Sequence, residues 1–389
     1  MTRINFFNQF DYSKIDFILL SLFSILSFSG LLILASASVH FSDSIYGNPS
    51  AIFNRQLFYF FLGLFGLLIF FILPLNFWIA YDRLFITLGF ILLLLVFVPG
   101  IGFEVNGANR WIRVAGFGLQ PSEIMKFLSI LYVSCYSVRR IKEIQSHWIG
   151  FFRPAIIIVS IISIILIQPD LGSSAVIFAS VLGVLFVAGV KIKQFFIVAF
   201  LGFVAVTLMI VFVPWRWERI ISFIDPWSDP WGSGYQLTLS LMSIGRGDWF
   251  GVGLGQGLMK MGYLPDAHTD FIFSVIVEEM GILGGFTIVS LLFGLSFRIF
   301  FIGRESLLRK NFFGFYFSYG VALLLGLHTF INVGVACGLL PTKGLTLPLI
   351  SAGGTNLIIV CLMIGLILRI DYENKNSMPI PLIKRRAEF

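Results

Sequence analysis

Residues 17–37 read FILLSLFSILSFSGLLILASA, an apolar run without a charged side chain. A helix needs about 20 such residues to cross the hydrocarbon core of a bilayer. The run is too long for the apolar core of a cleavable signal peptide. It therefore predicts an uncleaved first membrane span.

The same pattern recurs along the chain. Of its 389 residues, 58% are hydrophobic and 12% are charged, whereas a soluble domain carries about 25% charged residues. Apolar runs of spanning length fall at residues 17–37, 57–73, 84–99, 122–138, 152–168, 171–190, 194–213, 270–297, 312–333 and 346–368. The sequence thus predicts an all-α, polytopic membrane protein with about ten transmembrane helices.

The basic residues predict how the chain is oriented. Cytoplasmic loops hold the excess of Lys and Arg, and most of the 27 basic residues fall on the side that holds both termini. We therefore expect one transmembrane domain over residues 1–389, with both termini cytoplasmic. Within it, residues 214–269 form a large external loop between spans seven and eight, and residues 370–389 form a cytoplasmic tail.

The net charge of +7 fits these membrane flanks. No basic patch with interleaved aromatic residues stands out, so no nucleic-acid partner is expected. Cysteine and histidine spacing shows no metal site. The alternating glycines 251–257 follow no strand and precede no Gly-Lys-Ser/Thr, so a nucleotide-binding loop is not expected.

Polar residues gather on one face of this predicted topology. Four clusters lie at the outer ends of helices or in outer loops: residues 108–126, 168–172, the external segment ending at 263–271, and 341–354. A transporter would place such positions near the bilayer midplane, in both halves of the chain. The one-sided arrangement indicates a site at the membrane surface.

Two aspartates in these clusters each have two interpretations. Asp170 follows a proline at a tight turn, where it could cap a helix or contact a ligand. Asp270 opens an apolar run and could also be an N-cap. At a wet membrane boundary, its carboxylate could instead take a proton from a substrate hydroxyl. His268 could be a turn residue or a proton carrier.

Other ionisable residues lie within the predicted spans, where charges are costly. Glu123 and Lys126 are three residues apart on one helical face and can neutralise each other. Glu278 and Glu279 lie about 12 Å deeper than Asp270 if the helix is continuous. They need a basic partner, for which Lys126 or Lys343 could serve, and a structural ion pair is the favoured role.

In this order, the motifs resemble the SEDS family of bacterial cell-wall polymerases, the group of FtsW, RodA and SpoVE. The matching segments are NRWI at 109–112, QPSE at 120–123, QPDLG at 168–172, GVGLG at 251–255, YLPDAHTDF at 263–271 and PTKGLTLP at 341–348. The last segment resembles the division branch, FtsW, more than RodA. The resemblance covers nearly the whole chain.

The resemblance implies a peptidoglycan glycosyltransferase that polymerises lipid II outside the bacterial cytoplasmic (inner) membrane during cell division, at the septum. It implies that Asp270 is the essential acidic residue and thus the candidate catalytic base. Candidate substrate-binding residues, taken from the family motifs and from the polar and basic residues of the same face, are Arg110, Arg113, Glu123, Lys126, Asp170, Lys260, His268, Lys343 and Ser351. No cofactor site is recognisable, although a divalent cation could share the work of the basic residues.

In the implied reaction, an acceptor hydroxyl displaces a lipid pyrophosphate with inversion at the sugar. Arg246 is a further cation of the outer face. The implied partners are lipid II, membrane lipids, a class B penicillin-binding transpeptidase and other division proteins. Two positions depart from the family: Ala352 in the run Ser351-Ala-Gly-Gly, and Gly262, where some division members have a glutamate.

Two other functions stay open at the level of the sequence. A lipid II flippase would move the same lipid without joining sugars. A noncatalytic division scaffold would tolerate Asp270→Asn and still recruit its partner.

Overall fold

The computed structural model describes residues 11–105, 107–114, 117–342 and 344–376. After a short 3-10 turn at Tyr12–Lys14, its elements are α1 (Phe17–Ala37), α2 (Val39–Tyr46), α3 (Ala51–Ile72), α4 (Leu75–Leu95), β1 (Gly102–Val105), β2 (Ala108–Val114), β3 (Phe117–Leu119), α5 (Pro121–Arg139), α6 (Ile141–Ser146), α7 (Trp148–Ile167), α8 (Leu171–Val187), α9 (Ile192–Val211), α10 (Pro214–Ile224), α11 (Tyr235–Gly247), α12 (Ile272–Leu308), α13 (Phe312–Ala336) and α14 (Gly354–Lys375).

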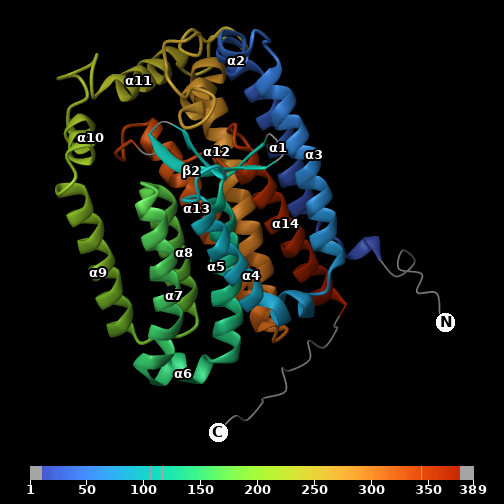
Figure 1. Ribbon diagram of the computed structural model, residues 1–389. Coiled ribbons are helices and arrows are strands. Elements are labelled where there is room, and N and C mark those ends of the chain that lie inside the picture. The colour runs from blue at the N-terminus through green and yellow to red at the C-terminus, as the bar shows by residue number, and fades with distance from the viewer. Residues whose placement is uncertain (1–10, 106, 115–116, 343, 377–389) are drawn as a thin grey trace.

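The long helices form a bundle with two different ends (Figure 1). The strands, α2, α10 and α11 lie toward one end, which we call the sheet end, and α6 lies at the other, the α6 end. The two ends of the described chain meet, because Lys14 Nζ donates to Asn376 Oδ1 at 2.5 Å.

Each of the ten predicted spans overlaps a helix, although the last of them, predicted from residue 346, begins only at Gly354. Eight are long and apolar enough to cross a membrane. The other two are α8, which has 17 residues, and α5, which carries Glu123 and Lys126 in its first turns. The prediction of an all-α, polytopic membrane protein is confirmed.

Helix α4 begins earlier than its apolar run suggested. The run was expected from residue 84 because Asp82 and Arg83 interrupt it, yet the helix starts at Leu75. Asp82 is buried and accepts two hydrogen bonds from Arg139 of α5, both at 2.7 Å. This pairing offsets the cost of a charge inside the bundle and lets the helix continue through it.

Helices α5 and α14 lie at the centre of the bundle, and α9 lies at its edge. Helix α14 packs closely on α3 at glycines. A Cβ added at Gly365 would lie 2.4 Å from the Leu67 carbonyl oxygen, and one at Gly63 would lie 2.9 Å from Cys361 Sγ. Such small residues let membrane helices approach closely without a gap. Helix α14 also runs on to Lys375, into the segment expected as a tail.

A small antiparallel sheet, with strand order β1-β2-β3, joins α4 to α5. Ile112 of β2 pairs with Gly102 on one side and Leu119 on the other. From the sequence, we expected only an outer loop here. The sheet matters because it carries the NRWI motif to the sheet end of the bundle.

Helix α12 is not continuous. Gly281 has φ 73° and ψ 178°, which breaks the helix. Along a straight helix, Val277 and Gly285 would be about 12 Å apart, yet a Cβ on Gly285 would lie 2.7 Å from Val277 Cγ2. The first part, residues 272–280, therefore folds back on the second and forms a separate half-helix.

Candidate active site

A cavity of about 570 Å³ lies at the sheet end of the bundle. It is lined by β2, the α7–α8 turn, α9, α10, α11 and two loops, of which one contributes Asp266, Asp270 and Phe271 and the other Pro341, Thr342 and Gly344. Its charged lining residues are Arg110, Asp170, Arg216, Arg219, Asp266 and Asp270. Of the residues predicted from the sequence, the structure thus brings Arg110, Asp170 and Asp270 together.

Asp270 is held by its backbone. Asn332 Nδ2 donates to the Asp270 carbonyl at 2.9 Å and to the Leu345 carbonyl at 2.6 Å. A Cβ on Gly344 would lie only 3.0 Å from Asp270 Oδ2, so the backbone there approaches the carboxylate closely. The N-cap of α12 is Phe271, which makes no side-chain cap bond. The N-cap interpretation of Asp270 is therefore wrong.

The surroundings favour the protonated form of Asp270. Burial raises the pKa of this carboxyl to about 7, and the negative charges of Asp266 and Asp170 act in the same direction. Arg110 and Arg219 oppose them. Since removal from water disfavours a charge, the group gains or loses its proton near neutral pH, as a general base should.

Asp170 both caps a helix and lines the cavity. Its Oδ1 accepts the Ser173 N–H at 3.0 Å, so the N-cap interpretation is confirmed. Its Oδ2 accepts the Ser122 hydroxyl at 3.2 Å, which ties the turn to α5. Both of its oxygens are thus already bonded to the protein.

Three arginines of the cavity form no ion pair within the described part of the chain. Arg110 donates to the carbonyls of Gln168 and Pro169, both at 2.8 Å. On α10, the guanidinium carbons of Arg216 and Arg219 lie 5.0 and 5.2 Å from the centre of the Trp215 ring. Their positive charges remain available to an anion.

Sequence reasoning did not identify Arg216 and Arg219 as candidate binding residues. They were counted only among the basic residues of the external segment. The signal present in the sequence is their spacing, because residues three apart share one face of a helix. The sequence does not show that α10 lies beside the α7–α8 turn, so it gave no reason to place these arginines near Asp270.

Glu123 and Lys126 lie inside the bundle and do not line the cavity. Lys126 Nζ is 2.7 Å from Glu123 Oε1 and 3.0 Å from His328 Nε2. Asn356 donates to the other Glu123 oxygen at 2.8 Å. Their mutual neutralisation is confirmed, and contact with a substrate stays a prediction.

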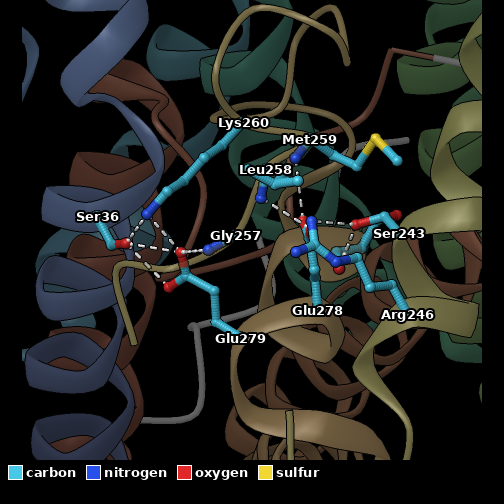
Figure 2. Close-up of polar contacts among 10 residues, drawn as sticks. Ser36, Ser243, Arg246, Gly257, Leu258, Met259, Lys260, Glu278 and Glu279 are labelled. Atoms are coloured by element: carbon cyan, nitrogen blue, oxygen red, sulfur yellow. Dashed lines mark hydrogen bonds and ion pairs between the residues drawn. The ribbon is translucent and has the colours of Figure 1, made fainter. Parts of the chain in front are cut away.

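Glu278 and Glu279 have different partners from those expected. Arg246 donates to Glu278 at 3.1 Å, and Lys260 donates to Glu279 at 2.5 Å (Figure 2). The structural ion pairs are confirmed, but Lys126 as their partner is wrong. Their expected position deeper in the membrane is also wrong, because Glu279 contacts Ser36, in the last turn of α1.

Three further predicted residues, His268, Ser351 and Arg113, are not among the residues that line the cavity. His268 is buried against the Phe41 ring at 4.4 Å, and this burial lowers its pKa. Ser351 donates to the Thr269 carbonyl at 2.6 Å and so holds the segment before Asp270. Arg113 is exposed, 4.9 Å from the Phe103 ring centre. Lys343 lies outside the described residues.

The departure at Gly262 has a structural reason. Its φ of 93° lies in the left-handed region, and a Cβ there would come within 2.9 Å of His40 Nε2. A glutamate at this position would need a different backbone and a different place for His40. Glycine at position 262 therefore leaves room for His40 of α2.

The fold and the cavity define a polytopic membrane protein with a charged site at one end of its helix bundle. The chain belongs to the FtsW/RodA/SpoVE family, described as "Cell cycle protein", which residues 16–376 match. It is 41% identical over 382 residues to the probable peptidoglycan glycosyltransferase FtsW of Buchnera aphidicola subsp. Acyrthosiphon pisum, covering 98% of this chain and 94% of that one. It is 44% identical over 347 residues to the protein of the same name in Coxiella burnetii, covering 89% and 93%.

Solved structures agree with this assignment. A chain from the study "Structural coordination of polymerization and crosslinking by a peptidoglycan synthase complex" superposes with a TM-score of 0.76 at 26% identity, over 93% of this chain and 98% of that one. The rod-shape-determining protein RodA of Thermus thermophilus superposes with a TM-score of 0.69 at 26% identity, over 92% and 97%. The arrangement of helices is thus shared with both.

Proposed function

We propose that this protein is a peptidoglycan glycosyltransferase that polymerises lipid II on the outer face of the bacterial inner membrane. The names of its relatives support the activity. The observation that carries the proposal is Asp270, a carboxyl group with a pKa of about 7 in a cavity lined by three arginines that form no ion pair with any described residue. The cavity thus combines a base with cations for a phosphate group.

In this reaction, the oxygen of the acceptor sugar's 4-hydroxyl attacks the anomeric carbon of the donor. Asp270 accepts the proton of that hydroxyl as the bond forms. The bond from that carbon to the pyrophosphate oxygen breaks, and undecaprenyl pyrophosphate leaves with the electron pair. One displacement inverts an α-linked donor to a β-linked product. A pyrophosphate leaves without being protonated, so a base is needed more than an acid.

The arginines stabilise the leaving group. Negative charge grows on the pyrophosphate as the bond breaks, and preorganised cations in a partly dry site stabilise it strongly. Arg216 and Arg219 are the best-placed candidates, because α10 presents both to the cavity. Ile210 of α9 and Leu166 of α7 add apolar surface to the same lining, which suits the start of a polyprenyl chain.

This proposal places the sheet end of the bundle outside the cell and the α6 end, with both termini, in the cytoplasm. Arg139, Arg140, Lys142 and Arg153 lie at or beside α6, as the positive-inside rule requires. Residues 214–269 are then external, and residues after Lys375 are cytoplasmic. The exported sugar groups of lipid II would meet the cavity from the outer face.

A class B penicillin-binding transpeptidase is the proposed partner, and the division septum is the proposed site of action. Two facts support a partner: one similar chain comes from a peptidoglycan synthase complex, and newly made strands must be cross-linked. The relatives named FtsW support the division role. A divalent cation sharing the pyrophosphate with the arginines remains part of the proposal.

The test is to reconstitute the purified protein in vesicles with fluorescent lipid II, with and without the cognate transpeptidase. Glycan strands on a gel, dependent on the protein, are the expected result. Lipid that crosses the bilayer without strand formation would replace the proposal with a flippase. Partner recruitment without either activity would replace it with a scaffold.

A further inference from the structure

Two adjacent buried carboxylates lie outside the cavity and take no direct part in the reaction above. Glu278 and Glu279 end the half-helix 272–280, just before the break at Gly281. Both are almost completely inaccessible to solvent. Buried carboxylates are costly unless hydrogen bonds and countercharges satisfy them, so their contacts indicate what they hold.

Glu278 is fully bonded (Figure 2). Its Oε1 accepts from Arg246 Nη1 at 3.1 Å and from the Leu258 N–H at 2.9 Å. Its Oε2 accepts from the Ser243 hydroxyl at 3.2 Å and the Met259 N–H at 3.3 Å. One side chain therefore fastens the loop at 258–259 to α11.

Glu279 fastens the same loop to a different helix. Its Oε1 accepts from Lys260 Nζ at 2.5 Å and from the Gly257 N–H at 3.4 Å. The Ser36 hydroxyl of α1 is 2.9 Å from both of its oxygens, and Lys260 Nζ also donates to Ser36 at 2.5 Å. Lys260 is buried in these contacts, so its charge is already neutralised.

The loop fastened in this way leads directly to Asp270. We call residues 257–271 the strap. Its first residues are bonded to the end of the half-helix, and its last residues precede the start of the same half-helix. Within the strap, Leu264 N–H donates to the Met259 carbonyl at 2.8 Å, and Phe271 N–H donates to the Asp266 carbonyl at 3.2 Å. The half-helix is about 12 Å long.

We infer that Glu279 and Lys260 form a positioning pair that fixes the strap and thereby the carboxyl group of Asp270, and that Lys260 does not bind the substrate. The expected effect on the polymerisation rate rests on the proposed function, whereas the contacts of Glu279 and Lys260 do not. Displacement of a catalytic group by about 1 Å can cost 100-fold in rate. A pair that holds one end of the strap can therefore control the rate without touching the lipid.

The test compares Glu279→Gln with the wild-type protein. The amide keeps the shape but loses the charge that holds Lys260. We expect the kcat of lipid II polymerisation to fall about 10- to 100-fold with KM within about twofold. The amides of 257–260 should exchange hydrogen faster in the variant, which is measurable by mass spectrometry.

Glu143→Gln is the matched control. It removes one carboxylate charge from α6, where Glu143 pairs with Arg140 and Arg153, and should change neither kcat nor exchange in the strap. The double variant Glu279→Gln, Lys260→Met should be no slower than the slower single variant, because both changes break one contact.

Three results would overturn the inference. They are a rise in KM at constant kcat for Lys260→Met, additive losses in the double variant, and unchanged exchange of the strap in Glu279→Gln. If Glu279→Gln does not fold, Ser36→Ala replaces it and should give a smaller change in the same direction. If the wild-type protein makes no strands, the proposed function fails, while the exchange measurement still tests the pair.

Discussion

Asp270 links local structure to the proposed chemistry. Its pKa of about 7 predicts a pH dependence, since a general base works only when unprotonated. We expect the initial rate of strand formation to rise with pH, with a midpoint near 7, and then to level off. Rates measured on purified lipid II between about pH 5.5 and 8.5 would check this. A flat profile through pH 7 would contradict it.

The same shift predicts an effect on stability. The folded-state pKa lies above the ordinary value of 3.8, so the free energy of unfolding falls as pH rises between about 4 and 7. Asp270→Asn removes this cost. We expect the variant to have a higher Tm than the wild type at pH 8, with the difference vanishing as the pH approaches 4. A lower Tm at pH 8 would show that the charge stabilises the fold.

At the scale of residues, the sequence predicted part of the cavity lining but not the two arginines of α10. Asp170, Asp270 and Arg110 were found because each belongs to a motif. Arg216 and Arg219 belong to none of the motifs used, and only the path of the chain after α9 brings them to the cavity. Lys260 has the right charge in the right loop, but its buried partner Glu279 cannot be identified without the fold.

Helix α10 places both of its arginines, Arg216 and Arg219, in the lining of the cavity. If they hold the pyrophosphate, Arg216→Ala and Arg219→Ala should each lower kcat/KM for lipid II about 10- to 100-fold, since a charge-assisted hydrogen bond contributes about 1.5–3 kcal/mol. Steady-state kinetics on the purified variants would measure this. Arg83→Ala, on the exposed face of α4, is the control and should have no effect. Equal losses in all three would point to a general charge effect.

The break in α12 depends on Gly281. Its φ of 73° disfavours side chains, and a Cβ would lie 2.2 Å from the Trp249 carbonyl oxygen. Gly281→Ala should therefore lower the Tm and strand formation together, because the half-helix must move. Gly294→Ala, in the same helix with open space around it, should change neither. A wild-type Tm for Gly281→Ala would contradict the left-handed backbone at Gly281.

Elements were predicted well where apolar length decides them. The ten spans appear as helices because the bilayer requires such runs. The fold-back at Gly281 was missed because residues 282–297 continue the apolar run beyond Glu278 and Glu279, and one glycine does not mark a break. The start of α4 was missed because Asp82 interrupts the apolar run and so suggests a helix boundary. Only the structure shows that Arg139 neutralises Asp82 inside the helix.

For the whole molecule, sidedness is the first requirement. Cysteines introduced at two positions test it. Trp231, in the 214–269 segment, is highly exposed, and Lys142 lies in α6, so the variants are Trp231→Cys and Lys142→Cys. We expect a membrane-impermeant thiol reagent to label position 231 in intact spheroplasts and position 142 only after lysis. The reverse pattern would place the cavity in the cytoplasm, away from exported lipid II.

The central claim is that Asp270 performs the proton transfer in an outward-facing cavity. The most direct measurement is strand formation from purified lipid II by Asp270→Asn in vesicles, beside the wild-type protein at equal amounts. Glycan strands from the wild type and none from the variant, with both proteins folded and inserted, are the predicted result. Strands of normal length and rate from the variant would contradict it and require another base.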